Sequence, residues 1–268
     1  SHQKEERLNA RVAGVLRLLA VTDESKQLIG EHEGVKALLR MAKAFPNSAT
    51  VQADIAGAMA VLAVDDSLEA ELAVGGGIEA LTNGLTKHKA NASVAAHVWH
   101  ALTNLSVSAE NKTRVAAAAD MKSLVNDSLK THSGAPRVIE GCATTLRNLC
   151  IGDAISSFVD DAMLNKLMGL LKQYTSQTIV ALALTSVIRT IAADKACAKE
   201  MAEKCDGHTI LNAVLAAHRD DDRLMKEVES AVRRLDDAVS AVPAVATRHA
   251  YLSACPRQQV LRLMRPSI

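Results

Sequence analysis

The chain has 268 residues, and its 31 basic side chains against 30 acidic ones leave a formal net charge of +1. Charge this balanced gives no overall field for nucleic acid, so a charged site has to come from local arrangement. Hydrophobic residues make up 49% of the chain but aromatic residues only 2%, which favours a core of closely packed helices built from Ala, Leu, Val, Ile and Met.

No apolar stretch approaches the roughly 20 residues of a membrane-spanning helix, and the N-terminal segment from Ser1 to Glu6 has no secretory pattern. The chain has five cysteines, an odd number without CxxC spacing, and we interpret them as reduced core thiols. These features predict an intracellular protein, with the cytoplasm as the expected compartment and nuclear, organellar or cytoskeletal association left open.

In chain order, the first predicted element is an amphipathic helix from Arg7 to Val21, within an N-terminal unit at 1–22. This helix is interpreted either as an atypical cap or as the remainder of a unit cut from a longer protein. Five repeat units follow between residues 23 and 238, at about 24–64, 67–107, 110–151, 154–193 and 196–237.

The five units are defined by apolar residues that recur about every 43 positions. The first ladder is Ile29, Leu72, Val115, Phe158 and Met201, and the second is Leu38, Leu81, Leu124, Leu167 and Ile210, each spaced by 43 residues. A third follows Leu19, Leu62, Leu105, Leu149, Ile191 and Leu235 with small drifts. A unit of this length cannot bury its own apolar face, so the units are expected to stack into one continuous core.

Each unit is predicted to contain a short helix, a second helix and a longer third helix. In the third unit, a short helix runs from Glu110 to Val115, and another runs from about Met121 to Leu129. The last carries Ile139, Cys142, Leu146 and Leu149, spaced 3, 4 and 3 residues apart as an amphipathic helix requires. No segment has the alternating pattern of a strand.

A basic segment at 239–268 ends the chain. It contains Arg248, Arg257, Arg262 and Arg265 but no acidic residue. Because a short apolar group from Val260 to Met264 follows two prolines, we expect a small helix that caps the last unit. The alternative is a recognition or autoinhibitory segment.

Three motifs resemble the armadillo repeat. They are Gly76-Gly77-Ile78-Glu79-Ala80-Leu81, Ala101-Leu102-Thr103-Asn104-Leu105-Ser106 and Thr145-Leu146-Arg147-Asn148-Leu149-Cys150. Over about residues 4–237 the resemblance implies an all-α, right-handed superhelical solenoid of three-helix armadillo repeats, similar to β-catenin and importin-α. HEAT repeats are the nearest alternative, and the three-helix unit argues against them.

The same resemblance implies a peptide-binding groove lined by the third helices. Armadillo proteins commonly hold a peptide backbone with an Asn of the third helix, a place occupied here by Asn104 and Asn148. The ladder is incomplete, because the other units carry Leu18, Val61, Thr190 and Arg234. The Trp that importin-α places four residues before each Asn is replaced by His100 and Thr144, and Trp99 is one position out of register.

One position before the Asn register, four of six third helices carry arginine. The six residues are Arg17, Ala60, Thr103, Arg147, Arg189 and Arg233. Guanidinium groups that recur once per repeat suit the carboxylates of an acidic peptide. The alternative is that these side chains lie in solvent with their stems packed on the helix surface.

Two other groups were considered as sites. His97 and His100 could share one helix face, but no third ligand is apparent, so a metal site is not expected. Trp99 is either a groove anchor or a core residue. The Gly75-Gly76-Gly77 run lacks phosphate-loop spacing, and no HExxH, GxSxG or paired-carboxylate motif is present.

The sequence therefore predicts a non-enzymatic adaptor without cofactors, which binds an extended and acidic segment of a partner protein. The candidate groove residues are Arg17, Trp99, His100, Asn104, Arg147, Asn148, Arg189 and Arg233. A structural scaffold, docked by its sides or ends into a multi-subunit complex such as an axoneme, an organelle anchor or a ribonucleoprotein, is the alternative. An RNA-binding helical repeat is a third reading, against which the neutral charge and the few aromatics argue.

Overall fold

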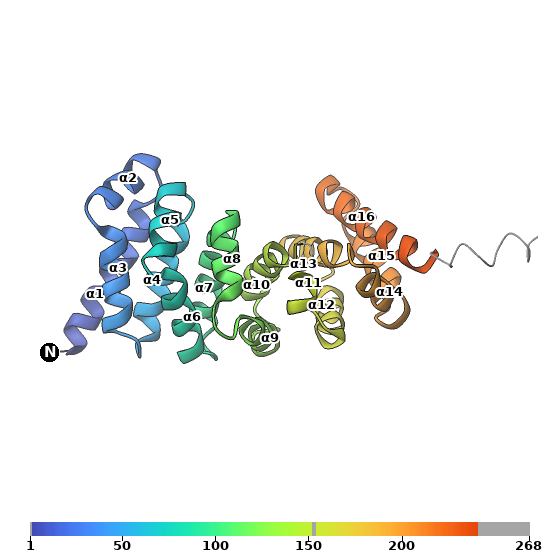
Figure 1. Ribbon diagram of the computed structural model, residues 1–268, viewed down its shortest axis with the longest axis horizontal. Coiled ribbons are helices and arrows are strands. Elements are labelled where there is room, and N and C mark those ends of the chain that lie inside the picture. Colours follow the sequence, from blue (N-terminus) through green and yellow to red (C-terminus); the bar gives the residue numbers. More distant parts are fainter. Residues whose placement is uncertain (1, 152–153, 241–268) are drawn as a thin grey trace, which may run out of the picture.

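The structure is a stack of helices along one long axis (Figure 1). It is a computed structural model that describes residues 2–151 and 154–240, and these residues form 16 α-helices and no strand. The expectation of an all-α solenoid is thus confirmed. The predicted capping helix at 260–264 and the rest of the tail beyond residue 240 lie outside the described residues.

The helices fall into three sets that alternate along the chain. The first helices of the units are α2 (Asp23–Glu31), α5 (Asp66–Val74), α8 (Ala109–Ala117), α11 (Ile155–Phe158) and α14 (Lys195–Lys204). The second helices are α3 (Gly34–Ala44), α6 (Gly77–Lys87), α9 (Met121–Thr131), α12 (Asp161–Gln173) and α15 (Gly207–Ala217). The third helices are α1 (His2–Leu19), α4 (Ala49–Leu62), α7 (Ala92–Leu105), α10 (Pro136–Leu149), α13 (Thr178–Ile191) and α16 (Asp222–Ser240).

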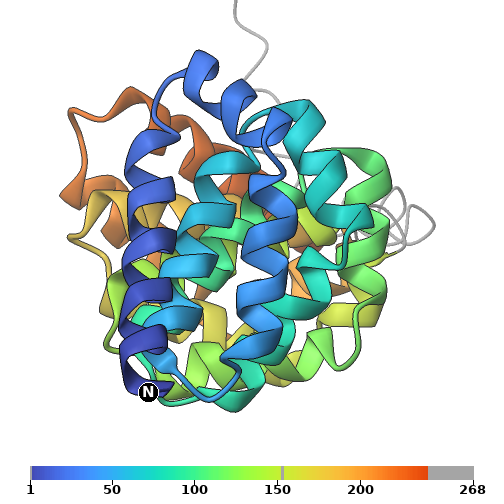
Figure 2. The same cartoon turned by 90° about the vertical axis from the view of Figure 1, so that its left-hand side faces the viewer.

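Consecutive third helices pack directly on each other along the stack. Seen from the N-terminal end, α1 and α3 run side by side while α2 crosses above them (Figure 2). Small residues permit close packing of the third helices: a Cβ on Gly141 of α10 would lie 3.0 Å from Cβ of Trp99 on α7. The third helices therefore form one continuous layer, with the first and second helices on its other side.

Side-chain caps start most of the first helices. Thr22, Asp65, Ser108 and Asp194 each accept a hydrogen bond from a backbone N–H in the first turn of the helix that follows. These caps satisfy donors that the helix itself leaves unpaired. The exception is the fourth unit, in which α11 has only 4 residues, whereas α5 and α8 have 9.

A left-handed residue joins the first helix to the second in four units. It is glycine only at Gly76, with φ 91°, and elsewhere it is Glu33, Asp120 and Asp206 with φ between 53° and 58°. The sequence motif predicts a glycine here because only glycine adopts this conformation without strain. Three of the four junctions therefore hold a residue with a Cβ in an unfavourable backbone conformation.

The three predicted apolar ladders form the core, with one exception. Leu38, Leu62 and Leu105 are among the largest fully buried side chains, and the other ladder positions are at most 9% exposed apart from Leu19. Leu19 is 55% exposed. It continues a stripe on α1 with Leu8, Val12 and Val15, which are 62%, 41% and 52% exposed. The equivalent positions on α4 are buried because α3 packs there.

A ladder of hydrogen bonds, which sequence reasoning missed, joins the ends of the second helices. We call it the hydrogen-bond ladder. In the second to fifth units, the residue that follows the second helix reaches back to a backbone carbonyl of the preceding unit. His88 Nε2 lies 3.1 Å from Pro46 O, and His132 Nε2 lies 2.8 Å from Lys89 O. Tyr174 donates to Ser133 O at 2.7 Å, and His218 Nε2 lies 2.6 Å from Thr175 O. The spacing of these residues was visible in the sequence.

The cysteines of the described residues carry free thiols. Cys142, Cys150 and Cys205 are buried and Cys197 is partly buried, so the prediction of core thiols holds for these four. Burial raises the pKa of the Cys150 thiol to about 12. Cys255 lies outside the described residues.

Candidate functional site

The candidate site is the third-helix face, by which we mean the surface formed by those side chains of the third helices that point away from the first and second helices. The partly exposed residues recur on it at helical spacing, as with His97, His100 and Asn104 on α7. The equivalent stripe on α10 contains Glu140, Thr144 and Asn148. All the predicted groove residues lie on third helices, but they differ in exposure and in bonding.

The side-chain amides of Asn104 and Asn148 form hydrogen bonds within the solenoid. Asn104 donates from Nδ2 to the carbonyl oxygen of Ala60 on α4 at 2.7 Å. Asn148 donates to Thr103 O at 3.3 Å and to Ser106 Oγ at 3.0 Å on α7. The last carbonyls of a helix have no partner within the helix, so each Asn caps the third helix of the preceding unit.

The same register continues with a different side chain in the last unit. Arg234 of α16 donates from Nη1 to Arg189 O at 2.6 Å, the bond that Asn would make there. In the unit between them the ladder is broken, because Thr190 turns its hydroxyl to Ser186 O of its own helix at 2.8 Å. The register predicted to hold a peptide backbone therefore carries contacts between repeats wherever an amide or guanidinium group occupies it.

The arginine register is clustered at the C-terminal end of the face. Arg147 is partly exposed, and its Nε and Nη2 donate to Asn148 Oδ1 at 3.3 and 3.0 Å. Arg189 pairs with Glu227 of α16 at 2.7 Å. Burial lowers the pKa of the Arg147 guanidinium, nearby Glu227 raises it, and the positive charges of Arg189 and Arg223 lower it. Arg147 thus lies within electrostatic range of Glu227, Arg189 and Arg223.

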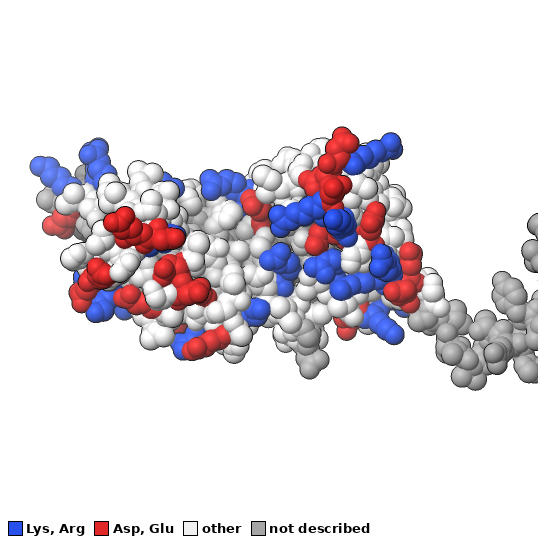
Figure 3. Space-filling view, turned by 90° about the horizontal axis from the view of Figure 1, so that it is seen from above, with Lys and Arg blue, Asp and Glu red and all other residues white. Residues whose placement is uncertain are grey.

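Figure 3 shows one side of the molecule, with several acidic residues gathered over the N-terminal half and with basic and acidic residues interspersed over the C-terminal half. The N-terminal half includes a hollow between α2 and α5 lined by Asp23, Glu31, Asp65 and Glu71. The C-terminal half includes Arg189 and Arg234, which line a common pocket.

The surroundings of Arg17 and Arg233 differ from those of the arginine cluster. Arg17 of α1 extends over α4, where a Cβ at Gly57 would lie 2.9 Å from its Cδ. It contributes to the electrostatics of Asp54 on α4 and His97 on α7, so these three form a polar group that crosses three helices. Arg233 is exposed on α16.

Trp99 is not a surface contact, which corrects its place among the predicted groove residues. Its exposed fraction is 0%, and the core alternative is the one that the structure supports. Trp99 lies one position before His100 and is therefore outside the stripe formed by His97 and His100. This position turns the indole into the layer between the helices. The next residue, His100, is partly exposed, and burial lowers its pKa.

The histidine pair on α7 does not belong to a cluster of metal ligands among the described residues. Within 2–151 and 154–240, the structure contains no cluster of three or more His, Cys, Asp or Glu side chains that could hold a metal ion. None of the helices in these ranges is long and apolar enough to cross a membrane.

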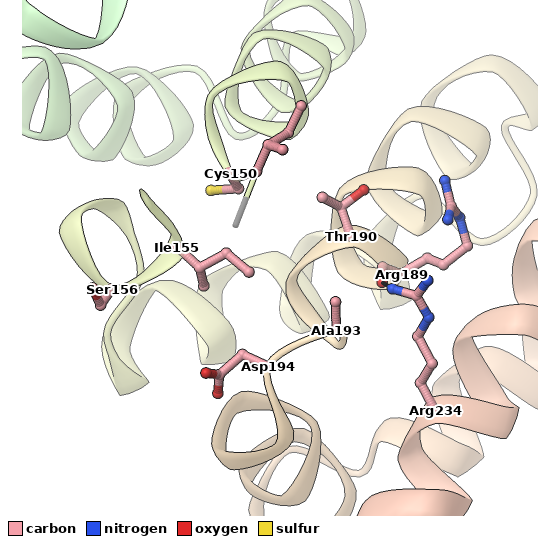
Figure 4. A pocket seen from close by; sticks show the side chains of 9 residues that line it. Cys150, Ile155, Ser156, Arg189, Thr190, Ala193, Asp194 and Arg234 are labelled. Atoms are coloured by element: carbon pink, nitrogen blue, oxygen red, sulfur yellow. Dashed lines mark hydrogen bonds between the residues drawn. The ribbon is translucent and has the colours of Figure 1, made fainter. Parts of the chain in front are cut away.

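Sequence reasoning missed one cavity, a pocket of about 560 Å³ near the C-termini of α10 and α13, which we call the α11 pocket. Its lining residues are Cys150, Ile151, Ile155, Ser156, Arg189, Thr190, Ala193, Asp194 and Arg234. Figure 4 shows Arg189 and Arg234 on one side, facing Ile155 and Cys150 across the opening.

The fold and the face define an armadillo-like repeat solenoid. A computationally designed armadillo repeat protein for modular peptide recognition has 19% sequence identity and a TM-score of 0.69, over 83% of this chain and 91% of that one. Two engineered proteins from the Northeast Structural Genomics Consortium have 22% and 20% identity, with TM-scores of 0.72 and 0.73 over 87% and 85% of this chain, and 92% of each of theirs. No family model matches the sequence, and no curated protein is significantly similar to it.

Proposed function

We propose that the protein is a non-enzymatic adaptor whose third-helix face binds an extended, acidic segment of a partner protein. The observation that carries this proposal is that Arg147, Arg189 and Arg223 lie within electrostatic range of one another, and that only Arg189 among them has an ion-pair partner, Glu227 at 2.7 Å. A bound carboxylate could pair with the other two guanidinium groups. The designed peptide-recognition protein of similar fold supports peptide binding as the mode.

We place the centre of binding in the C-terminal units. Asn104 donates from Nδ2 to Ala60 O, which leaves its Oδ1 for a ligand, whereas the amide of Asn148 is engaged by Thr103, Ser106 and Arg147. Arg147 and Arg223 are not in any ion pair within the described residues. Specificity for charge would therefore come from the arginines, and Asn104 would add a contact that does not depend on the sequence of the partner.

The test is fluorescence anisotropy with a labelled 12-residue polyglutamate peptide and a polylysine peptide of equal length. We expect the acidic peptide to bind and the basic one not to bind, with affinity that falls as salt rises because the contact is ionic. Arg147→Gln and Arg223→Gln together should weaken binding about tenfold, a change equivalent to about 1.4 kcal/mol.

Arg114→Gln is the matched control, because Arg114 lies on the first helix α8 and pairs there with Glu110 at 2.8 Å. Its replacement removes one positive charge from another surface, so it is compared with Arg147→Gln alone, which also removes one. Equal weakening by these two single substitutions would mean that only net charge matters, and it would contradict a site on the third-helix face. A labelled oligouridylate in the same assay tests the RNA alternative, which would predict tighter binding of RNA than of polyglutamate.

One observation favours the alternative role of a scaffold docked through its ends. The stripe of Leu8, Val12, Val15 and Leu19 on α1 is exposed at positions that are core in the other units. Val12→Lys with Leu19→Lys should abolish docking of that kind and leave binding of the acidic peptide unchanged. Membership of a multi-subunit complex is compatible with either role.

A further inference from the structure

An exposed apolar residue follows the end of each of the first four third helices. Val21, Val64, Val107 and Ile151 are 73%, 62%, 69% and 57% exposed. They are separated by 43, 43 and 44 residues, so they keep the register of the repeat. We call these four residues the apolar rim. Because consecutive third helices pack against each other, the residues that follow their ends recur along one edge of the stack.

Local helix stability does not account for the rim. Val21, Val64 and Val107 immediately precede the capping residues Thr22, Asp65 and Ser108, a position from which an apolar side chain often packs against the fourth residue of the helix. That fourth residue is polar in all three helices, being Lys26, Glu69 and Lys112. The three valines therefore have no apolar partner at the usual place, in agreement with their exposure.

The rim ends at the α11 pocket. Ile151, its last member, lines this pocket, where buried Ile155 lies beside it. Arg189 and Arg234 form the opposite side (Figure 4). A guanidinium group has five N–H donors, and the contact of Arg234 with Arg189 O uses one of them.

Among the described residues that line the α11 pocket, the carboxylate of Asp194 is engaged elsewhere. Asp194 is the N-cap of α14 and accepts a hydrogen bond from Cys197 N at 2.9 Å. The pocket thus combines an apolar wall with a guanidinium group that retains donors. Such a lining suits a segment that carries an apolar side chain next to a carboxylate.

We propose that the apolar rim and the α11 pocket bind the partner segment by its side chains, with an apolar residue on each rim position and an acidic residue at Arg234. The proposal deepens the proposed function and rests on it. Packed helices lie about 8–10 Å apart, and an extended chain advances about 3.3 Å per residue. The partner is therefore an acidic segment with an apolar residue at about every third position.

The experiment compares three labelled peptides with the intact chain, namely four copies of Leu-Glu-Glu, four copies of Ser-Glu-Glu, and six copies of Leu-Glu. We expect the first to bind about tenfold tighter than the second, since apolar contacts worth about 1.4 kcal/mol give that factor. The alternating peptide should bind more weakly than the first, because its apolar spacing does not match the repeat.

Val64→Ser with Val107→Ser should remove the advantage of Leu-Glu-Glu over Ser-Glu-Glu. Val74→Ser is the matched control, because Val74 is 72% exposed at the end of α5 but lies outside the rim register. Arg234→Gln should weaken the binding of both the Leu-Glu-Glu and the Ser-Glu-Glu peptide. The amide of the glutamine can still donate to Arg189 O. Circular dichroism and thermal melting confirm that each variant folds.

Each outcome bears on one of the two proposals. Equal binding of Leu-Glu-Glu and Ser-Glu-Glu, both weakened by the Arg147 and Arg223 substitutions, would overturn the rim and leave the basic face in place. Tighter binding of Leu-Glu-Glu that only the rim substitutions reduce would support the rim and overturn the basic face. If neither peptide bound, both proposals would be wrong.

Discussion

Asn104 donates a hydrogen bond to the carbonyl oxygen of Ala60, 44 residues earlier, at 2.7 Å. This bond joins the ends of two neighbouring third helices, and Asn148 and Arg234 repeat it further along the stack. A residue type expected to contact a ligand is thus also a means of fixing one repeat against the next. Binding and stability are consequently coupled at this register, and any test of binding has to separate them.

Asn104→Ala is expected to lower the free energy of unfolding by about 1–3 kcal/mol, because a partly buried carbonyl then loses its donor. Asn104→Asp should cost more, since a carboxylate would face the Ala60 carbonyl with no proton to donate. Urea unfolding monitored by circular dichroism measures both changes.

Asn165→Ala provides the control for that series. Asn165 is exposed on α12, and its amide donates to Asp161 O of its own helix at 2.8 Å. Its removal should change stability by less than about 0.5 kcal/mol, as is usual for surface positions. Similar costs at both sites would mean that the bond between repeats contributes nothing beyond the local helix.

The hydrogen-bond ladder at the ends of the second helices leads to a similar prediction. His132 is only 5% exposed, and its ring N–H donates to Lys89 O of the preceding unit. His132→Ala should destabilise the fold by about 1–3 kcal/mol. Hydrogen exchange should show the loosening, with faster exchange in α9 and in the turn around Lys89 than in α14 and α15. Uniform acceleration over the whole chain would instead indicate global unfolding only.

The core was readable from the sequence because buried positions repeat every 43 residues or so, and burial depends on side-chain type. The burial of Trp99 could not be read from the sequence, since one residue of helical register separates the exposed stripe from the interior. The bonds of Asn104 and Asn148 were also beyond sequence reasoning. Their amides have the same chemistry for a ligand and for a neighbouring carbonyl, and only the distance between α4 and α7 decides between them.

The α11 pocket and the apolar rim show two further limits. The segment of α11 keeps the apolar residue Phe158 of the first ladder, so its short helix was not predicted, and the hollow beside it depends on where α13 and α16 lie. The rim was visible as a register of apolar residues, yet it looks like a fourth core ladder until exposure is known. Periodicity therefore predicts that positions are equivalent without saying which side of the helix layer they occupy.

The left-handed junctions predict a gain of stability. Asp120 has φ 58°, at the position where the preceding unit has Gly76 with φ 91°. Asp120→Gly should stabilise the protein by about 1 kcal/mol because the strain of a Cβ in this conformation is relieved. Asp120→Ala keeps the Cβ and should bring no such gain. Gly76→Ala should destabilise by a similar amount, and the melting temperatures of the three variants measure the pattern.

The last prediction concerns His97, which lies on the third-helix face next to Arg17 and Asp54. Burial lowers its pKa, the positive charges of Arg17 and Arg137 lower it further, and Asp54 opposes them. A histidine with a lowered pKa in the folded state binds its proton more readily when the chain unfolds. Its contribution to stability is therefore complete above the unfolded value of about 6.5 and is lost as the pH falls below that value.

We expect the free energy of unfolding to decrease between pH 7.5 and pH 5.5, and His97→Gln to reduce this slope. The remaining slope should contain a part from His100, whose pKa is lowered by burial as well. Asp54 acts in the opposite sense, since burial raises its pKa, but its effect belongs to a more acidic range because an ordinary aspartate titrates near 3.8. Urea titrations at four pH values distinguish these contributions. If His97→Gln left the slope unchanged, the pKa of His97 would be the same in the folded and in the unfolded chain, and the prediction would be wrong.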